Sequence, residues 1–499
     1  MSYSSSFVHD FVRRLGEQRS VPTKWQNDEF PDFDFRDASD HNLLVSRSSP
    51  RSFRLGTGAS IFADALIPAI VSAKSEVIFV TCFWAPSVTL SALHDALSKL
   101  AIYRRDTRSD AQSTPLRVRI CLSSRSLFQK LFHPQSRHGR IYPPSSWQKD
   151  FGLPDPALLE AGGIELQVKS LFFLPFSVMH PKFVIIDRQL AFVPSCNVSW
   201  EAWLEGCVEL TGDAVHCLMS FYVRTWEAGL DLSKPLQNYT AADPVFEVQN
   251  ASLTLISSPA HHRVTLDATT APLQTIILPS SHHWNPVFHP LPWQKYPKVP
   301  GTPLNIALLE LFDRARQSIY VQTPNVTCEP VIATLLDAIR RGVDVTIVTS
   351  RNMMLIEQLV TAGTTTAWCI RSLVRRFNKL EAASEGRDLE ADGRSLGRLR
   401  VSYFRRRPSA KANNVEGEAL IGGQGEEPVH SHLKLTIVDD EFTVLGSGNM
   451  DRASWYTSQE LGILFHDGGF AGTVKAGVDS VLDGRLDLVF DSQRRQERD

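Results

Sequence analysis

The feature that most constrains this chain is an eight-residue pattern that occurs twice. His180-Pro-Lys-Phe-Val-Ile-Ile-Asp187 and His432-Leu-Lys-Leu-Thr-Ile-Val-Asp439 both read H-x-K-x4-D. After six further residues each copy is followed by a second matched element, Pro194-Ser-Cys-Asn197 in the first and Gly446-Ser-Gly-Asn449 in the second. Two extended copies with the same spacing are a poor fit to coincidence. The chain is therefore predicted to contain a duplicated unit with a functional residue set in each half.

Each motif has the pattern of a buried strand. Read as a strand, His180 and Lys182 share one face, whereas Asp187 lies on the other. The nearly continuous apolar run between them predicts a strand that is buried on both faces. We therefore expect the His and Lys of each copy to emerge together at one strand end. Asp187 and its counterpart Asp439 are expected to have a structural or supporting role.

These residue types suit phosphodiester chemistry. One imidazole can attack phosphorus and form a phosphohistidine, and a second imidazole on the opposite side can protonate the leaving alkoxide. The Lys and Asn side chains would bind the non-bridging oxygens without a metal, and a trailing Glu in each half would hydrogen-bond the far ring nitrogen of a His. The predicted catalytic residues are His180, Lys182, Asn197, Glu209, His432, Lys434, Asn449 and Glu460, with Ser195 and Ser447 in support.

The paired motif resembles the signature of the phospholipase D superfamily, H-x-K-x4-D-x6-G-S-x-N, which occurs twice in bilobal enzymes. The second copy is also similar to bacterial-type cardiolipin synthases, through Asp439-Asp-Glu and Gly446-Ser-Gly-Asn-Met-Asp-Arg-Ala-Ser454. The resemblance implies the same residue roles, with His180 as the nucleophile and His432 as the general acid. Pro194 departs from the family pattern, which usually has Gly there. Since Pro lacks an N–H and has a fixed φ, the first loop is expected to differ in shape from the second.

The superfamily includes lipases, lipid synthases and nucleases, so the substrate has to be argued from the surroundings of the site. The net charge of −2 lacks the basic excess of a nucleic-acid-binding protein. Apolar segments at Leu171–Met179 and Trp284–Tyr296 suit either a membrane interface or ordinary packing beneath a loop. We expect an enzyme that hydrolyses or transfers the phosphatidyl group of phospholipids at a membrane surface. The alternatives are a nuclease and a non-catalytic phosphate-binding protein, although both motifs are intact.

Composition adds expectations about compartment and cofactors. The N-terminus has no secretory pattern, and no apolar stretch approaches the length of a membrane span. The seven Cys are scattered without a C-x2-C pair, which favours a reducing compartment and argues against zinc. The histidines at 282, 283 and 289 are interpreted as surface residues. We expect an intracellular protein, cytoplasmic or peripherally membrane-associated, that uses no metal or other cofactor.

The repeat extends beyond the motifs and predicts the fold. Helix-like and strand-like segments alternate in both halves in the same order, as in α/β domains. We expect two similar α-β-α sandwich lobes with mixed central sheets, related by a pseudo-twofold axis and facing one shared site. The predicted divisions are a polar, peripheral segment at 1–50, a first lobe at 51–245 and a second lobe at 246–490, with insertions near 376–398 and 407–428.

Overall fold

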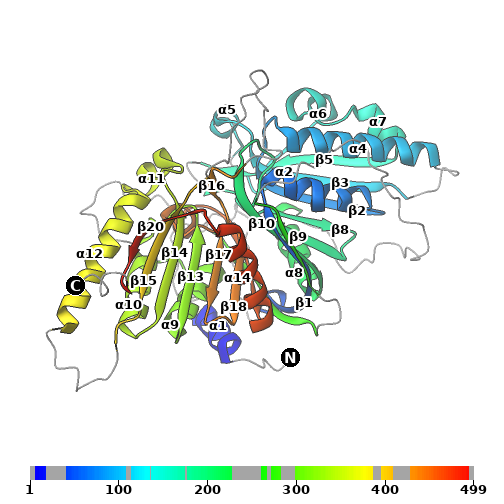
Figure 1. Ribbon diagram of the computed structural model, residues 1–499. Helices are drawn as coiled ribbons and strands as arrows, with labels where there is room; N and C mark the ends of the chain where they lie inside the picture. Colours follow the sequence, from blue (N-terminus) through cyan, green and yellow to red (C-terminus); the bar gives the residue numbers. More distant parts are fainter. Residues whose placement is uncertain are drawn as a thin grey trace.

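The computed structural model shows two α/β lobes that lie side by side and share one continuous sheet (Figure 1). The residues that the structure describes are 6–17, 41–107, 114–134, 136–174, 177–227, 260–266, 271–281, 298–385, 395–407 and 427–493. The predicted fold, two similar lobes with mixed sheets, is confirmed.

The first lobe contributes one half of the sheet. Its strands are β1 (Val45–Gly56), β2 (Glu76–Phe83), β3 (Leu116–Ser124), β4 (Arg140–Tyr142), β5 (Ile164–Ser170), β8 (Phe183–Ile186), β9 (Leu190–Pro194) and β10 (Trp203–Gly212), beside a separate small hairpin of β6 (Phe172–Phe173) and β7 (Ser177–Val178). β5, β3 and β2 are parallel neighbours, and β8, β9, β10 and β1 continue the sheet in antiparallel pairs.

The second lobe repeats this order. Its strands are β11 (His262–Thr265), β12 (Leu273–Ser280), β13 (Ser318–Thr323), β14 (Asp344–Ser350), β15 (Leu399–Phe404), β16 (His430–Ser431), β17 (Leu435–Val438), β18 (Phe442–Gly446), β19 (Glu460–His466) and β20 (Leu486–Asp491). The sequence of neighbours β15-β14-β13-β17-β18-β19-β12 matches β5-β3-β2-β8-β9-β10-β1 in both order and direction. β1 pairs with β12, so the two half-sheets join at the pseudo-twofold axis.

Helices cover the sheet in both lobes. Those of the first lobe are α2 (Gly58–Ile61), a π-helical turn η3 (Phe62–Leu66), α3 (Ile67–Val71), α4 (Val88–Thr107), α5 (Leu127–Leu131), α6 (Pro144–Phe151), α7 (Pro156–Ala161) and α8 (Asp213–Trp226); a 3-10 turn η2 (His41–Leu43) precedes β1. Those of the second lobe are α9 (Pro303–Arg314), α10 (Glu329–Arg340), α11 (Leu355–Ala362), α12 (Thr366–Glu385), α13 (Arg452–Tyr456) and α14 (Gly468–Leu482). α8 and α14 both pack against strands at the junction of the lobes.

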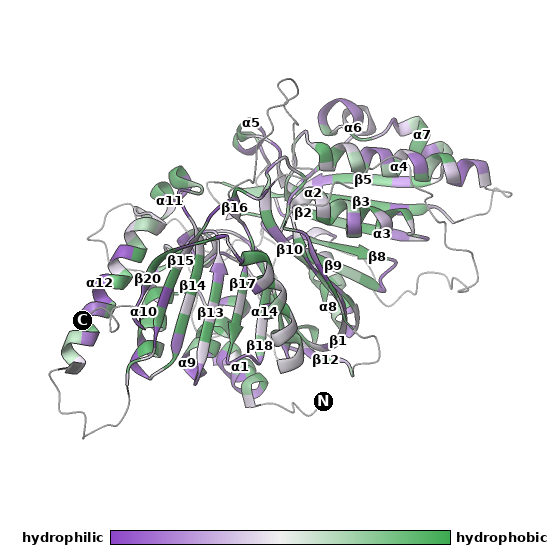
Figure 2. Cartoon of the chain, viewed as in Figure 1, coloured by the Kyte–Doolittle hydropathy of each residue, from purple (hydrophilic) through white to green (hydrophobic). Residues whose placement is uncertain are grey.

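The equivalent helices α2 and α9 both begin at a threonine that caps the helix. Thr57 caps α2 by accepting a hydrogen bond from the N–H of Ser60, and Thr302 caps α9 by accepting one from Asn305. The strands at the centre of the sheet are hydrophobic, whereas α12 carries hydrophilic segments (Figure 2). β8 and β17, which follow the motif histidines, are buried along their whole length, as the apolar runs predicted.

One expectation about a peripheral segment is wrong. Residues 6–17, expected to be peripheral, form the amphipathic helix α1 (Ser6–Glu17), whose Phe7 and Phe11 are buried in the core. Phe7 packs against Phe442 of β18, so an N-terminal segment completes the second lobe. Residues 376–385, part of the expected insertion at 376–398, form the second half of α12. Most of the expected insertion at 407–428 lies outside the described residues.

Candidate active site

The two motif histidines are each held by a carboxylate from the opposite lobe. His180 of the first lobe lies with Nδ1 at 2.9 and 3.0 Å from the two carboxylate oxygens of Glu460 at the start of β19. His432 of the second lobe lies with Nδ1 at 2.8 Å from Oε1 of Glu205 in β10. Since ionised carboxylates only accept hydrogen bonds, both rings carry the proton on Nδ1 and present a lone pair at Nε2.

Backbone hydrogen bonds also connect each motif histidine to the opposite lobe. The N–H of His180 donates to the carbonyl of Gln459, 2.9 Å away, and the N–H of His432 donates to the carbonyl of Leu204, 2.8 Å away. Each acceptor immediately precedes the Glu that holds that His. β10 also pairs in parallel with β16 through Leu204 and Ser431. Each histidine is thus positioned by a segment of the other lobe, through both main chain and side chain.

The hydrogen bond predicted for Glu209 is not found, and Glu205 makes it instead. Glu209 accepts hydrogen bonds from Ser52 and from Arg54, at 2.7 and 2.8 Å. Strand register explains the error: Pro194 is opposite Cys207, and Gly446 is opposite Gly462, so the residues two before each partner, Glu205 and Glu460, are equivalent. The sequence spacing misled the prediction because the second connection is three residues longer and contains α13.

The serines of the two loops hold these carboxylates. The hydroxyl of Ser195 donates to Glu205, and that of Ser447 donates to Glu460. The N–H of Ser195 donates to the carbonyl of Gly206 (2.8 Å), and that of Ser447 donates to Leu461 (3.0 Å). We expected Pro194 to give the first loop a different shape from the second. At these serines that expectation is wrong. Pro194 lies at the end of β9, and the N–H of each serine still donates its hydrogen bond.

The lysines differ between the two halves. Lys182 and Lys434 are both buried. Nζ of Lys182 donates to the carbonyl oxygen of His180 at 2.9 Å, whereas Nζ of Lys434 lies 2.7 Å from Nε2 of His432. His432 is also the more enclosed ring, with 4% of its side chain exposed against 15% for His180, and the Trp203 ring lies 4.9 Å from it. Neither His nor Lys lies within a strand, because β8 and β17 begin immediately after each Lys.

Burial and charge together set the protonation of this cluster. Burial lowers the pKa of His432 to about 3 and also lowers the pKa of His180, against the opposing pull of Glu205 and Glu460. Burial opposes ionisation of the two carboxyls, but the histidine partners together with the hydrogen bonds from Ser195 and Ser447 outweigh it and hold both pKa values below the usual range. Burial lowers the pKa of Lys434 to about 7. The resting arrangement is thus two neutral imidazoles that face two ionised carboxylates.

Charges from both motifs act on each histidine. Lys434 contributes to lowering the pKa of His180, and Lys182 contributes to lowering that of His432. Together with the crossed hydrogen bonds from His180 to Glu460 and from His432 to Glu205, these charges indicate that the two motif sets belong to one cluster. The structure therefore brings His180, Lys182, Lys434, His432 and Glu460 together as the sequence predicted.

The two asparagines flank this cluster. Asn197 accepts a hydrogen bond at Oδ1 from the N–H of Phe83, at the end of β2. Asn449 donates from Nδ2 to Asp451, 3.0 Å away. Cys196, between Ser195 and Asn197, is buried, and burial raises its pKa well above the usual thiol value. All seven cysteines are free.

The motif aspartates lie at the other ends of their strands. Asp187 accepts hydrogen bonds from the N–H groups of Lys74, Ser75 and Glu76, and from the hydroxyl of Ser75. Asp439 accepts equivalent bonds from residues 316–318. Each thus holds the turn that enters the strand paired with its own motif strand, β2 or β13, in agreement with the predicted structural role.

The apolar segment before His180 is part of the core. Leu171, Phe172, Phe173 and Met179 are buried, so ordinary packing accounts for them. The aromatic segment Trp284–Tyr296 and the histidines at 282, 283 and 289 lie outside the described residues. None of the described helices is long and apolar enough to cross a lipid bilayer. In the described ranges, no three His, Cys, Asp or Glu side chains are grouped as a metal ion would require.

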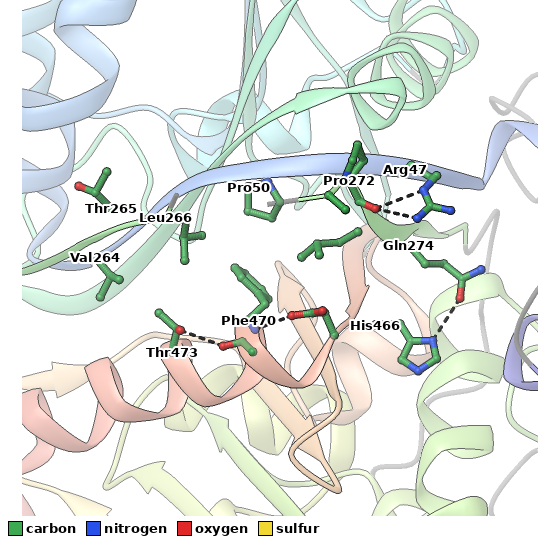
Figure 3. A pocket seen from close by; sticks show the side chains of 14 residues that line it. Arg47, Pro50, Val264, Thr265, Leu266, Pro272, Gln274, His466, Phe470 and Thr473 are labelled. Carbon is green, nitrogen blue, oxygen red and sulfur yellow. Dashed lines mark hydrogen bonds between the residues drawn. The ribbon is translucent and has the colours of Figure 1, made fainter. Parts of the chain in front are cut away.

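A separate cavity of about 800 Å³ lies at the lobe junction, between β1, β12 and the start of α14 (Figure 3). Arg47 donates to the carbonyl of Pro272 at its rim, and His466 hydrogen-bonds Gln274. None of the predicted site residues lines it. It is therefore distinct from the histidine cluster.

Comparisons with known proteins bear on this arrangement. Residues 308–481 match the model of the phospholipase D-like domain of cardiolipin synthase. A search of curated proteins finds no match. Among solved structures, phosphatidylserine synthase from Haemophilus influenzae is similar over 91% of this chain and 92% of its own, with a TM-score of 0.51 and 15% identity. Polyphosphate kinase from Porphyromonas gingivalis (84% of this chain, 44% of its own, TM-score 0.39, 11% identity) and NucT from Helicobacter pylori (37% and 89%, TM-score 0.24, 16% identity) are more distant.

The duplicated motifs, the family match in the second lobe and the fold shared along the chain agree with one another. The resemblance read from the sequence is confirmed: residues 308–481 form a phospholipase D-like domain, and the chain as a whole has the bilobal fold of the phospholipase D superfamily.

Proposed function

We propose that this protein is a phosphodiesterase or phosphatidyltransferase that acts on phospholipids through a phosphohistidine at His180. The observation that carries the proposal is the state of that ring. Glu460 holds Nδ1 with both carboxylate oxygens, which fixes the lone pair on Nε2. In the described part of the chain, the hydrogen bonds of His180 involve Nδ1 and the main chain and leave Nε2 free to attack.

His432 is the proposed general acid. Its Nε2 lies 2.7 Å from Nζ of Lys434, so a proton can pass from the lysine to the ring and on to the leaving oxygen. Burial lowers the pKa of Lys434 to about 7, which makes it a better proton donor than an ordinary lysine. Attack by His180 forms the N–P bond while the P–O bond to the head group breaks, and the head-group oxygen takes the proton from His432.

The second step reverses these roles. His432, now neutral, removes a proton from water or from an acceptor alcohol, whose oxygen attacks phosphorus and releases His180. Lys182, Lys434 and the amide groups of Asn197 and Asn449 are the proposed donors to the non-bridging oxygens. Binding of phosphate would draw Lys182 from the carbonyl of His180, and Lys434 would turn to the phosphate after it has passed its proton to the ring of His432.

The phospholipid assignment rests on three supports. The second lobe matches a cardiolipin synthase model, the fold is that of a phosphatidylserine synthase, and the net charge of −2 gives no overall attraction for nucleic acid. A peripheral association with membranes inside the cell follows as part of the same proposal.

The decisive experiment compares substrates and traps the intermediate. Purified protein is assayed on phosphatidylglycerol-containing vesicles and on single-stranded DNA, each with and without EDTA, and the enzyme is quenched during turnover for mass spectrometry. We expect phospholipid turnover that resists EDTA, with phosphate on His180. Cleavage of DNA with untouched phospholipid would overturn the lipid assignment. Loss of turnover with EDTA, restored by a divalent ion, would overturn the metal-free mechanism.

A further inference from the structure

Two short helices present unusually exposed apolar side chains, one in each lobe. In α5 and the residue that follows it, Phe128 is 72% exposed and Phe132 is 66% exposed. In α11, Ile356 is 80% exposed and Leu359 is 48% exposed. We call the full set the apolar rim: Leu127, Phe128, Leu131, Phe132, Leu355, Ile356, Leu359 and Val360. Apolar residues gathered in this way at a surface mark an interaction site.

The two helices occupy equivalent places in the duplicated fold. α5 follows β3, and α11 follows β14, the equivalent strand of the second lobe. Each helix is anchored by a buried glutamine. Gln129 donates to the Tyr142 hydroxyl and to Ser170, and Gln358 binds Asn325 and the main chain of Met353. The polar anchor holds one face of each helix to its lobe, which leaves the apolar side chains on the other face.

The helices lie on the same side of the molecule as the histidine cluster. The hydroxyl of Ser123 in β3, the strand before α5, accepts a hydrogen bond from the N–H of Met179, the residue before His180. Ser350 at the end of β14, the strand before α11, is hydrogen-bonded to Ser431, the residue before His432. In Figure 1, α5 and α11 lie near β16, which leads into His432. The apolar rim therefore borders the approach to the site.

Charged residues around the apolar rim suit an anionic surface. Arg140 lies beside α5 on β4, and Arg351 immediately follows β14; both are exposed. Arg371 lies about one helical turn after the exposed Trp368 at the start of α12. Apolar side chains with nearby basic residues are the pattern of an interfacial membrane contact.

We propose that the apolar rim of α5 and α11 inserts into the surface of a phospholipid bilayer and places the mouth of the histidine site against the head groups. The proposal rests on the proposed function and adds the surface by which it operates. The occupant is a lipid surface rather than a second protein copy because the rim is split between two lobes on either side of the site. A protein that covered both halves would block the entry of substrate.

The test measures vesicle binding in a background that cannot turn over. Two double variants, Phe128→Ser/Phe132→Ser and Ile356→Ser/Leu359→Ser, are made in His180→Ala protein and sedimented with phosphatidylcholine vesicles, with and without phosphatidylglycerol. Each is expected to lose about tenfold or more in partitioning, because each substitution removes a large apolar group from the interface. Circular dichroism and thermal unfolding confirm that the variants are folded.

Ile102→Ser is the matched control. Ile102 is 41% exposed and apolar, but it lies near the end of α4, 14 residues from the first residue of that helix. The chain enters α4 from the site side, at the end of β2, so this position is about 20 Å along the helix from there. Its vesicle binding is expected to equal that of the parent protein. An equal loss in this control and in the rim variants would overturn the proposal.

Two further results separate this inference from the proposed function. In catalytically competent protein, the ratio of turnover on vesicles to turnover on a dispersed short-chain phospholipid should fall in both rim variants. Turnover of phospholipid with unchanged vesicle binding in the variants would overturn the rim and leave the function standing. Rim-dependent vesicle binding without any phospholipid turnover would overturn the proposed function and leave the apolar rim standing as a membrane contact. Absence of vesicle binding, with a dimer that the rim variants convert to a monomer, would make a second copy the occupant and overturn the proposal.

Discussion

The two halves of the candidate site are built alike but are not equivalent. In both, a His, a Lys and a Ser are positioned by the same strand connections, and a Glu from the other lobe holds Nδ1 of the His. The rings differ in access, since His180 is 15% exposed and His432 is 4% exposed beneath Trp203. They also differ at Nε2, which Lys434 contacts only in the second half. Duplication thus provides two equal frameworks, and in the proposed mechanism the small differences around them suit one ring to attack and the other to transfer protons.

The largest expected effect comes from removing either ring. His180→Ala and His432→Ala should each lower turnover by about a thousandfold or more, because one removes the attacking atom and the other removes the proton donor. The phosphohistidine intermediate distinguishes the two rings. With a substrate whose leaving group needs no protonation, His432→Ala should still accumulate phosphate on His180. Steady-state assays and intact-mass measurement check both. Phosphate trapped on His432 would reverse the assignment of roles.

A second prediction separates the two carboxylates of β10. Glu205→Gln should lower kcat by about a hundredfold, because a neutral amide neither fixes the tautomer of His432 nor stabilises its charged form. Glu209→Gln is the matched control on the same strand. It should retain most of the activity and lose some stability, since it weakens a partly buried pair with Arg54. Equal losses of kcat in the two variants would show that the bond from Glu205 to the ring is not important for turnover.

A third prediction tests why one loop has Gly and the other has Pro. At Gly446 φ is +151°, and an added Cβ would lie 2.3 Å from the carbonyl oxygen of Leu461. Gly446→Ala should therefore lower the free energy of unfolding by about 2 kcal/mol, measured by urea denaturation. Pro194→Ala should change it by less than about 1 kcal/mol, because the end of β9 accepts an ordinary residue. The opposite ranking would contradict the described loop geometry.

The smallest expected effect is a dependence of stability on pH. The pKa of His432 is lower in the folded protein than the unfolded value of about 6.5, so the unfolded chain binds more protons below that pH. Stability should fall as pH decreases from about 6.5, by on the order of 1 kcal/mol per pH unit. Glu205 and Glu460, whose pKa values are lowered, add to the loss only below about pH 4.5.

Thermal unfolding at a series of pH values measures this dependence. His432→Asn provides the control, because it keeps a polar side chain of similar shape and does not titrate. Its unfolding temperature should depend less steeply on pH than that of the wild type between pH 6.5 and 5. Identical slopes would show that His432 is not buried in the neutral form.

Much of this arrangement could be predicted from the sequence because duplication repeats local signals. The apolar runs after each motif indicated β8 and β17, and Glu460 was correctly expected to bind a motif histidine, which in the structure is His180. Glu205 was missed because its equivalence to Glu460 is defined by strand register rather than by distance along the chain. The crossing of the carboxylates between lobes depends on how the lobes dock, which no local pattern encodes.

Two other features depended on tertiary structure. The helix α1 has polar residues on one face, and only its contact with the second lobe identifies Phe7 and Phe11 as core residues. The apolar rim could not be distinguished from core residues by sequence, because Leu, Phe and Ile at helical spacing usually indicate a buried face. In α5 and α11 the buried face instead carries a glutamine, Gln129 or Gln358, and the apolar side chains are exposed.

The crossed carboxylates make each lobe depend on the other for the position of its motif histidine. A lobe produced alone would contain a motif histidine without the Glu that sets its tautomer, and with its main-chain donor unpaired. Any hinge motion that separated the lobes would misplace both rings at once, so activity reports directly on whether the halves are in contact. Two inactive halves expressed as separate chains should recover turnover only when they associate, with a dependence on concentration that measures the affinity of one lobe for the other.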